Sequence, residues 1–392
     1  MTELDEGSLA ETPASTASSR AAGILPSQQL RELVANGEIE SDTKGLADLI
    51  QPASIDLRLG GVAHRLRASF LPGEGRPVAE RIEEFSMHSI DLKDGAVLEV
   101  GCVYIVPLVE RLNLGAAVSG IANPKSSTGR LNVFTRLISD GATEFDRVPA
   151  GYRGPLYAEI APNAFSILVR PGTRLNQLRL QRGSPNLRDG TLRQLNEEVG
   201  LVGERPEAAK ISKGLIFTVD LAGLGQERLI GFRAKRHTGV IDLSRIGHYD
   251  PSEYWDPLPA SPKRGLILDP NEFYILASKE TVRIPPTHAA EMIPYDNAIG
   301  EFRVHYAGFF DPGFGWAPEG GAGTRAVLEV RSHEVPFLIE DGQAVGRLAY
   351  DRLAEQPDVL YGAKIGSSYH AQGLTLSKHF KPLDEGTAAR QG

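Results

Sequence analysis

The sequence predicts a mainly β protein, with two tandem β domains and a few short helices. The first observation is a half-buried strand, because Ile55, Leu57 and Leu59 alternate with polar residues before Gly60. The second is the frequency of turn-forming residues, because 42 glycines and 26 prolines separate short apolar runs that have little helical periodicity. The third is an internal repeat, which indicates duplication of one domain. Together they favour barrels or sandwiches.

The internal repeat has a constant offset of 268 − 98 = 170 positions, which places residues 98–105 on residues 268–275. The same offset, without a gap, relates four further pairs: Pro124 with Pro294, Glu159 with Glu329, Gly172 with Gly342, and Leu178 with Leu348. Unrelated strands do not keep one spacing over such a length, so we expect two copies of one β domain.

These copies define the predicted domain boundaries. Residues 1–22 are rich in Ala, Ser and Thr and are expected to form a disordered tail. The first domain spans 23–185 and opens with a helix over 28–36, for which Ser27 is the expected N-cap. Residues 186–211 are polar and predict a linker with a short helical patch at 191–199. The second domain spans 212–392.

Composition excludes several classes of protein. The single cysteine, Cys102, excludes a disulfide framework and a cysteine-rich zinc site. A net charge of −8 argues against a general nucleic-acid binder. No apolar run approaches the roughly 20 residues that span a bilayer. The acidic N-terminus lacks a signal-peptide pattern, so no membrane association and a cytoplasmic location are expected.

The stretch from Pro124 to Leu131 is the strongest candidate for a binding site. Ser126 and Ser127 lie between Lys125 and Arg130, and Gly129 lets the backbone approach a ligand. Hydroxyls and backbone N–H groups donate to phosphate oxygens, and the cations neutralise charge. A polyanion is therefore the expected ligand, against the alternative of an ordinary polar surface turn.

The second copy lacks this turn and carries other features. At the same offset it has Asp296, Asn297 and Gly300. It has instead a tight aromatic turn over 309–315, which includes Phe310 and Asp311. The two copies thus diverge where chemistry would lie.

Both copies keep a glutamate with apolar neighbours near the end of a strand, Glu159 and Glu329. If such a strand is buried, the pKa of the carboxyl rises and the group becomes a usable general base. The alternative is a carboxylate that faces solvent.

Near the C-terminus, Tyr361 and the segment 367–378 combine hydroxyls, aromatic rings, a Gly and Lys378. Chain ends of this kind can order over a ligand, and a frayed tail is the alternative.

With these motifs in place, the chain resembles the dCTP deaminase branch of the dUTPase-like superfamily, as a fused tandem. Residues 51–60 resemble the first signature strand of that family. Residues 125–131 resemble its Arg-Ser-Ser-x-x-Arg motif, with Lys125 in place of the first arginine. Residues 171–178 resemble its late Pro-Gly strand, and residues 369–378 resemble its closing Gln-Gly-x-Thr-x-Ser segment.

The resemblance implies distorted jelly-roll β-barrels and hydrolytic deamination of dCTP to dUTP and ammonia, as a hydrolase acting on a cyclic amidine C–N bond. It implies a water activated by a glutamate, no zinc, and Mg²⁺ held by the triphosphate rather than by protein residues. Self-association into a homo-oligomer is expected, and dTTP is a candidate effector.

In this family each site is shared between barrels, which suggests a composite site in this chain. The first copy would supply Ser126, Ser127 and Arg130, and the second copy would supply Glu329 as the base. Glu159 is the alternative base. The remaining substrate-binding candidates are Lys125, Gly129, Phe310, Asp311, Tyr361, Tyr369, Gln372 and Lys378.

Two other functions stay open. The Tyr152-Arg153-Gly154 sequence resembles the dUTPase branch, and Asp146 could serve as its carboxylate, which would give dUMP and pyrophosphate from dUTP or, in a bifunctional enzyme, from dCTP. The other alternative is a protein that binds a pyrimidine nucleotide without catalysis.

Overall fold

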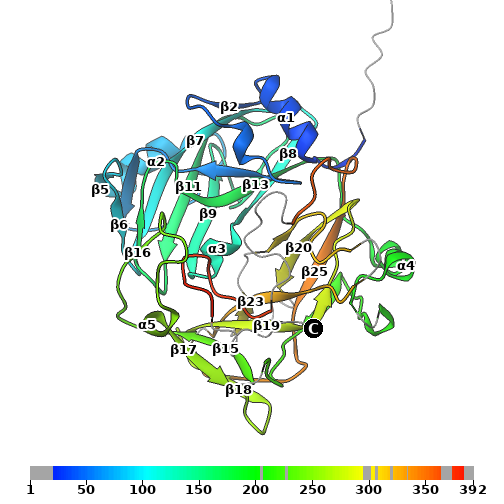
Figure 1. Ribbon diagram of the computed structural model, residues 1–392. Helices are drawn as coiled ribbons and strands as arrows, with labels where there is room; N and C mark the ends of the chain where they lie inside the picture. Colours follow the sequence, from blue (N-terminus) through cyan, green and yellow to red (C-terminus); the bar gives the residue numbers. More distant parts are fainter. Residues whose placement is uncertain are drawn as a thin grey trace, which may run out of the picture.

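The computed structural model describes residues 21–203, 206–225, 228–294, 302–304, 308–317, 321–332, 334–362 and 373–383. Within these residues the chain consists mainly of strands with a few short helices, which confirms the predicted class (Figure 1). Closure of either half into a barrel stays a prediction. Apart from residues 21 and 22, the predicted N-terminal tail lies outside the described residues.

The first half forms two main sheets. One has the strand order β1–β13–β8–β10, with β3 also paired to β13, and the other has the order β5–β4–β7–β11–β9, with β2 also paired to β7. The strands are β1 (Gly23–Ile24), β2 (Ile39–Ser41), β3 (Ile55–Arg58), β4 (Val62–Leu66), β5 (Ser86–Asp91), β6 (Ala96–Leu98), β7 (Val103–Asn113), β8 (Val118–Pro124), β9 (Val133–Ser139), β10 (Arg147–Val148), β11 (Arg153–Pro162), β12 (Ile167–Val169) and β13 (Arg174–Arg182).

The second half repeats this plan. Its sheets have the orders β14–β25–β20–β22 and β17–β15–β19–β23–β21, and β18 pairs with β24. The strands are β14 (Leu215–Thr218), β15 (Leu229–Ala234), β16 (Ile241–Asp242), β17 (Trp255–Pro259), β18 (Gly265–Leu268), β19 (Phe273–Val282), β20 (His288–Pro294), β21 (Phe302–Val304), β22 (Phe309–Phe310), β23 (Thr324–Ser332), β24 (Phe337–Glu340) and β25 (Ala344–Arg352).

Strand register shows that the two halves are copies. Leu178 of β13 lies opposite Ala122 of β8, and Leu348 of β25 lies opposite Met292 of β20. The members of each pair differ by 348 − 178 = 170 and 292 − 122 = 170 positions, which is the offset seen in the sequence. The duplication therefore extends to the pairing of individual residues.

The helices are short: α1 (Ser27–Ala35), α2 (Val78–Phe85), α3 (Ser126–Gly129), α4 (Asp189–Val199) and α5 (Pro251–Tyr254), with 3₁₀ turns at Ala47–Leu49 and Pro206–Ala208. None of these helices in the described part of the chain has the length and apolar character that crossing a bilayer requires. The expectation that Ser27 caps α1 was wrong, because Pro26 occupies the N-cap and the Ser27 hydroxyl bonds to Asp358.

The predicted linker is packed against the second half rather than exposed. It contains α4, and Leu192, Leu201 and Val202 are buried in the hydrophobic core of the second half. Residue Asn186, at its start, donates a hydrogen bond to Asp351 over 2.7 Å. The segment therefore joins the halves and also completes one of them.

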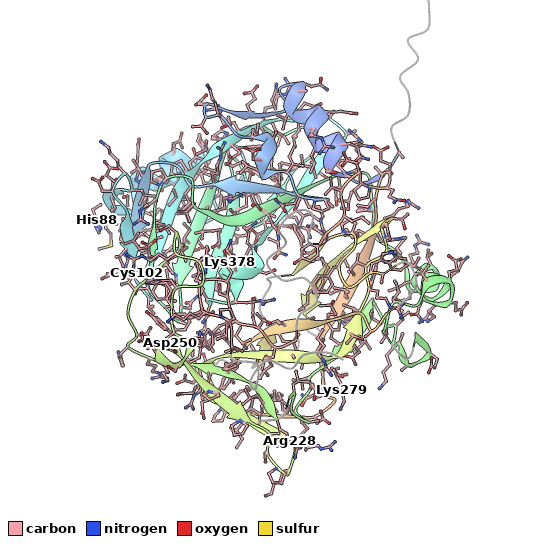
Figure 2. The ribbon with its side chains drawn as sticks, viewed as in Figure 1. His88, Cys102, Arg228, Asp250, Lys279 and Lys378 are labelled. Atoms are coloured by element: carbon pink, nitrogen blue, oxygen red, sulfur yellow. The ribbon has the colours of Figure 1, made fainter. Side chains whose placement is uncertain are left out.

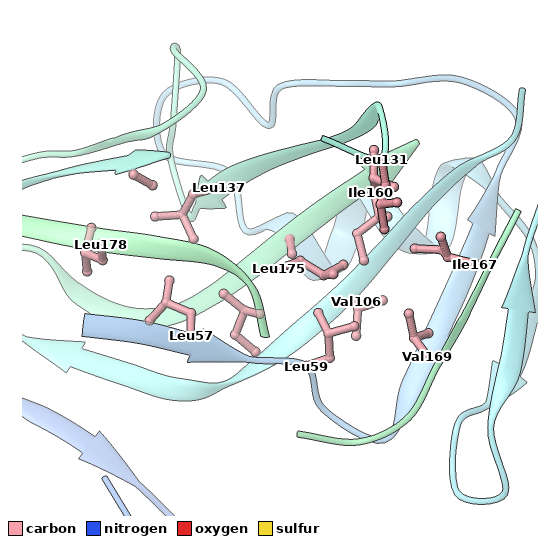
Figure 3. Packing of buried hydrophobic residues seen from close by; sticks show 14 of the residues in the cluster. Leu57, Leu59, Val106, Leu131, Leu137, Ile160, Ile167, Val169, Leu175 and Leu178 are labelled. Atoms are coloured by element: carbon pink, nitrogen blue, oxygen red, sulfur yellow. The ribbon is translucent and has the colours of Figure 1, made fainter. Parts of the chain in front are cut away.

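The core of the first half extends beyond that half. Its centre is aliphatic, with Leu57, Val106 and Leu178 among the side chains packed between the sheets (Figure 3). The second half and the C-terminal segment add Trp255 and Phe380 to the same core. In addition, β16 of the second half pairs in parallel with β12 of the first. The halves therefore share a hydrophobic core, which fixes their relative position.

Candidate active site

A cavity of about 710 Å³ lies between the two halves and the C-terminal segment. Side chains from α3 and β13 line one part of it, and side chains from β22 and β23 line another. Lys378 of the C-terminal segment also lines the cavity, and it is labelled near the centre of the view in Figure 2. Of the predicted site residues, the cavity collects Lys125, Ser126, Ser127, Arg130, Phe310, Asp311, Glu329, Tyr361 and Lys378.

The Ser-Ser stretch folds as a single helical turn, α3, directly after strand β8. It is fastened to β13, because the N–H of Lys125 and the hydroxyl of Thr128 both donate to the carbonyl of Leu175, each at a distance of 2.8 Å. A tight turn between two strands places Ser126 and Ser127 at the cavity wall. Hydroxyls and a nearby cation in this arrangement suit an anionic ligand.

Gly129 has a different position from the one expected. Its N–H donates to the Lys125 carbonyl at a distance of 3.0 Å, so this N–H is not available to a ligand. Its backbone lines a second cavity of about 500 Å³ instead.

The aromatic turn of the second half forms the facing wall. Phe310 ends β22, which pairs with β20, and Asp311 follows it directly. The Phe310 and Phe314 rings meet edge to face at 5.0 Å between centroids, and Phe314 contacts Tyr361 at 5.7 Å. Gly313 has a φ of 97°, a left-handed conformation that glycine adopts without strain. The ring stack thus holds Asp311 at the cavity.

Glu329 is the glutamate of the cavity, and it is buried. It lies in β23 opposite Ile275 of β19, and only 3% of the residue is exposed. Its Oε2 atom is buried and has no hydrogen-bond partner among the described residues. Burial raises the pKa of Glu329 well above its usual value, and the positive charge of Arg130 opposes that rise. A carboxyl of raised pKa beside a cation is suited to general acid–base work near neutral pH.

Glu159, the alternative base, has a different environment. It lies opposite Ile105 in β11, and its Oε1 accepts hydrogen bonds from Nε of Arg136, at 2.9 Å, and from the Nη2 atom of the same guanidinium. It lines neither of the two cavities. The geometry therefore places Glu329 at the Ser-Ser turn and Glu159 in an ion pair away from it.

The C-terminal segment closes over the Ser-Ser turn. The Arg130 guanidinium donates to the carbonyl of Thr375 over 3.0 Å, and the Ser377 hydroxyl donates to the carbonyl of Ser127 over 2.8 Å. Burial, with the positive charges nearby, lowers the pKa of Lys378. Tyr369 and Gln372, which were predicted to bind substrate, lie outside the described residues.

Several residues of the cavity were not predicted. Arg174 and Gln177 lie in the Pro-Gly strand, and Asp56 lies in the first signature strand, so each belongs to a motif that the sequence displays. Asp56 forms ion pairs with Lys125 and, at 3.4 Å, with Arg174. One end of the cavity therefore combines the cations Lys125, Arg174 and Lys378, which suits several negative charges on one ligand.

The residues of the dUTPase alternative lie elsewhere. The Asp146 carboxylate accepts the N–H of Leu137 over 2.7 Å and lines the second cavity. Burial raises the pKa of Asp146 to about 7. The Tyr152 hydroxyl donates to the carbonyl of Pro155 over 2.6 Å inside the protein. Neither residue lines the cavity of the Ser-Ser turn, and Asp146 instead shares the second cavity with Gly129 and Glu329.

No group of three or more His, Cys, Asp or Glu side chains in the described residues is arranged to hold a metal ion. The expectations of Mg²⁺ on a triphosphate and of catalysis without zinc stay predictions.

A mainly β protein with hydroxyls and cations around one buried glutamate has the groups that a hydrolase of an anionic substrate requires. Comparison with known proteins narrows this class. The chain matches the model of the 2'-deoxycytidine 5'-triphosphate deaminase N-terminal domain over residues 21–184 and that of the C-terminal domain over residues 188–380. The chain belongs to the dCTP deaminase family.

Relatives of known structure and sequence agree with this assignment. A solved structure of 2'-deoxycytidine 5'-triphosphate deaminase from Agrobacterium tumefaciens is 52% identical, with a TM-score of 0.84, over 88% of this chain and 100% of that one. A dUMP-forming dCTP deaminase of Corynebacterium glutamicum is 29% identical over 168 residues, which are 41% of this chain and 85% of its own. A dUMP-forming dCTP deaminase of Nocardia farcinica is 29% identical over 189 residues, which are 46% of this chain and 92% of its own.

Proposed function

We propose that this protein hydrolyses dCTP to dUTP and ammonia in one composite site, with Glu329 as the base. The observation that carries the proposal is the buried carboxyl of Glu329, which lies in one cavity with Ser126 and Arg130 from the other half of the chain. A buried carboxyl opposite hydroxyls and a cation can activate water against a bound ring.

In the proposed reaction Glu329 moves two protons. It takes a proton from water as the water oxygen bonds to C4 of the cytosine, and delivers that proton to N3. It then takes the proton of the new hydroxyl and passes it to the amino group. The C4–N bond breaks, ammonia leaves, and a carbonyl remains at C4. The raised pKa of Glu329 suits both directions of transfer.

The other residues of the cavity would hold the substrate. Lys125, Arg174 and Lys378 lie at the end suited to a triphosphate. Mg²⁺ would be bound by the triphosphate oxygens and would neutralise part of their charge. Arg130 would stabilise the ionised form of Glu329, because its charge opposes the rise in the carboxyl pKa. Zinc has no role in this proposal.

A second candidate product is dUMP. The curated relatives from Corynebacterium and Nocardia carry the name dUMP-forming dCTP deaminase, and this favours a second hydrolysis at phosphorus in the same site. That reaction would release pyrophosphate as well as ammonia.

The test is direct. Purified protein is incubated with dCTP and Mg²⁺, with and without a zinc-selective chelator, and the nucleotides are separated by ion-exchange chromatography. We expect dUTP and ammonia in both samples. Formation of dUMP and pyrophosphate would establish the second candidate, and loss of activity with the chelator would contradict zinc independence. If dCTP stays intact, and dUTP in a separate incubation also stays intact, the catalytic proposal is wrong.

A further inference from the structure

A single arginine of the first half reaches into the active-site wall of the second half. Arg179 lies in the middle of β13, and only 1% of the residue is exposed. Its guanidinium donates to the carbonyl of Ala290 at 3.1 Å and to Asp311 Oδ1 at 3.2 Å, with the carbonyl of Phe310 at 3.5 Å. It also lies over the ring of Phe309, 3.9 Å from the centroid.

All four contacts are made to the aromatic turn and its neighbouring strand. The planar guanidinium meets a carboxylate, two carbonyls and a ring face at once, which the compact ammonium of a lysine does not do. Among the described residues, Arg179 is the only hydrogen-bond partner of the Asp311 side chain. The repeat offset of 170 places Ala349 at the corresponding position of β25, so this arginine belongs to the first copy alone.

Burial makes the contact important. Asp311 is 9% exposed and Arg179 is 1% exposed, so each charge is largely removed from water. A buried charge that loses its partner is strongly destabilised, which means that the two side chains depend on each other. Arg179 does not line the cavity, whereas Phe309, Phe310 and Asp311 do.

We propose that Arg179 is a positioning residue for the reaction, which holds the Asp311 carboxylate and the Phe309–Phe310 edge in the geometry that receives the nucleotide. The proposal rests on the proposed function, since it assigns a role within that site. It also gives the duplication a consequence for catalysis. The strand β13 of one copy supplies the support for the substrate-facing turn of the other copy, and a protein with identical copies would lack this difference.

The test is a double-mutant cycle on dCTP turnover, after wild-type activity has been established. Because misplaced substrate contacts cost on the order of 100-fold, we expect Arg179→Met and Asp311→Asn each to lower kcat/KM by about 100-fold. The double variant should lose far less than the product of the two single losses, because Arg179 acts largely through Asp311. Arg179→Lys should lie between wild type and Arg179→Met, since it keeps the charge without the planar fork.

The matched control is Arg182→Met, on the same strand. Arg182 is 7% exposed and donates a hydrogen bond to Gln29 at a distance of 2.6 Å. It does not line the cavity, so its loss should leave kcat/KM within about twofold of wild type. Two results would overturn the proposal: an Arg179→Met protein that folds and keeps wild-type kcat/KM, or additive losses in the double variant. If Arg179→Met does not fold, the cycle is measured with Arg179→Lys. A wild-type protein without dCTP deaminase activity would instead contradict the proposed function.

Discussion

Glu159 and Glu329 occupy the same position of the two copies, but only Glu329 lines the cavity between the halves. They lie opposite Ile105 and Ile275, and both differences, 329 − 159 and 275 − 105, equal 170. The Oε2 atoms of both glutamates have no hydrogen-bond partner among the described residues, but the Oε1 atom of Glu159 is held by Arg136. Duplication thus produced two equivalent carboxyls with different chemical surroundings.

The first prediction separates these two carboxyls. Glu329→Gln should lower turnover of dCTP on the order of 10³-fold, because the amide cannot accept the proton of water. Glu159→Gln should keep turnover within about threefold and lower the free energy of unfolding by about 1–3 kcal/mol, since it weakens a charged hydrogen bond. Steady-state kinetics and urea unfolding measure the two effects. An inactive but stable Glu159→Gln protein would assign catalysis to the first copy.

The second prediction concerns the completeness of the site in one chain. Arg130 and Glu329 belong to one chain and line the same cavity, so two inactive variants cannot repair each other. We expect that Arg130→Met and Glu329→Gln proteins, unfolded and refolded as a mixture, stay inactive at every ratio. Recovery toward a quarter or more of wild-type activity would show that sites form between chains. The expected self-association is tested separately, by light scattering on the wild-type protein.

The third prediction is a pH dependence of the reaction. Burial raises the pKa of Glu329, and the base acts only when it is deprotonated, so kcat/KM should rise with pH through this raised pKa. The acidic limb should therefore lie well above the usual glutamate value of about 4.3. Arg130→Gln removes a charge that lowers the pKa, so the limb measured on its residual activity should shift to still higher pH. An acidic limb at the usual value would contradict the assignment of Glu329.

The fourth prediction concerns stability. Asp351 is 4% exposed, and burial raises its pKa to about 6, above the usual aspartate value of about 3.9. The raised pKa means that the folded protein binds this proton more tightly than the unfolded chain. The contribution of protonated Asp351 to the free energy of unfolding is therefore fully present below about pH 4. It falls by on the order of 2 kcal/mol as the pH rises to 6 to 7.

Asp351→Asn tests this contribution, because Asn186 can still donate to the side-chain oxygen. The decrease in the free energy of unfolding between pH 4 and pH 7 should become smaller by that amount in urea titrations. Asp94→Asn, at an exposed position, serves as the control and should keep the wild-type decrease. A wild-type pH profile in the Asp351→Asn protein would refute the prediction.

The fifth prediction concerns the C-terminal segment. The bond between the Ser377 hydroxyl and the carbonyl of Ser127 fastens this segment over the Ser-Ser turn. Its loss costs about 1 kcal/mol, so Ser377→Ala should raise KM for dCTP about fivefold with little change in kcat. Ser332→Ala is the matched control. The Ser332 hydroxyl also donates to a carbonyl, that of Val335, at a distance of 2.6 Å, and it does not line the cavity. Equal KM values in the two variants would contradict a role of the segment in binding.

Part of this architecture was accessible from the sequence. The offset of 170 residues predicted the duplication and, through it, the shared register of the strands. The resemblance of residues 125–131 to a family motif predicted that Ser126 and Arg130 face Glu329, and the cavity collects all three. Such features depend on spacing and residue type, which a sequence displays directly.

Other parts depend on contacts between distant segments. Nothing near Arg179 in the sequence indicates that it meets Asp311, because that contact arises from the packing of one half on the other. The ion pair of Glu159 with Arg136 is also a tertiary contact, and it distinguishes two glutamates that look alike in the repeat. The helix α2 was missed although Val78, Ile82 and Phe85 recur at helical spacing, because it is only 8 residues long and packs on a small satellite cluster.

The shared core has a consequence for the synthesis of this protein. Trp255, Leu374 and Phe380 complete the hydrophobic core of the first half, and β16 completes the edge of β12. A ribosome makes the first half long before it makes these residues, so the nascent first half would leave apolar surface open until residues 374–380 emerge. The order of synthesis therefore makes the docking of this segment a late step for both the fold and the closure of its active site.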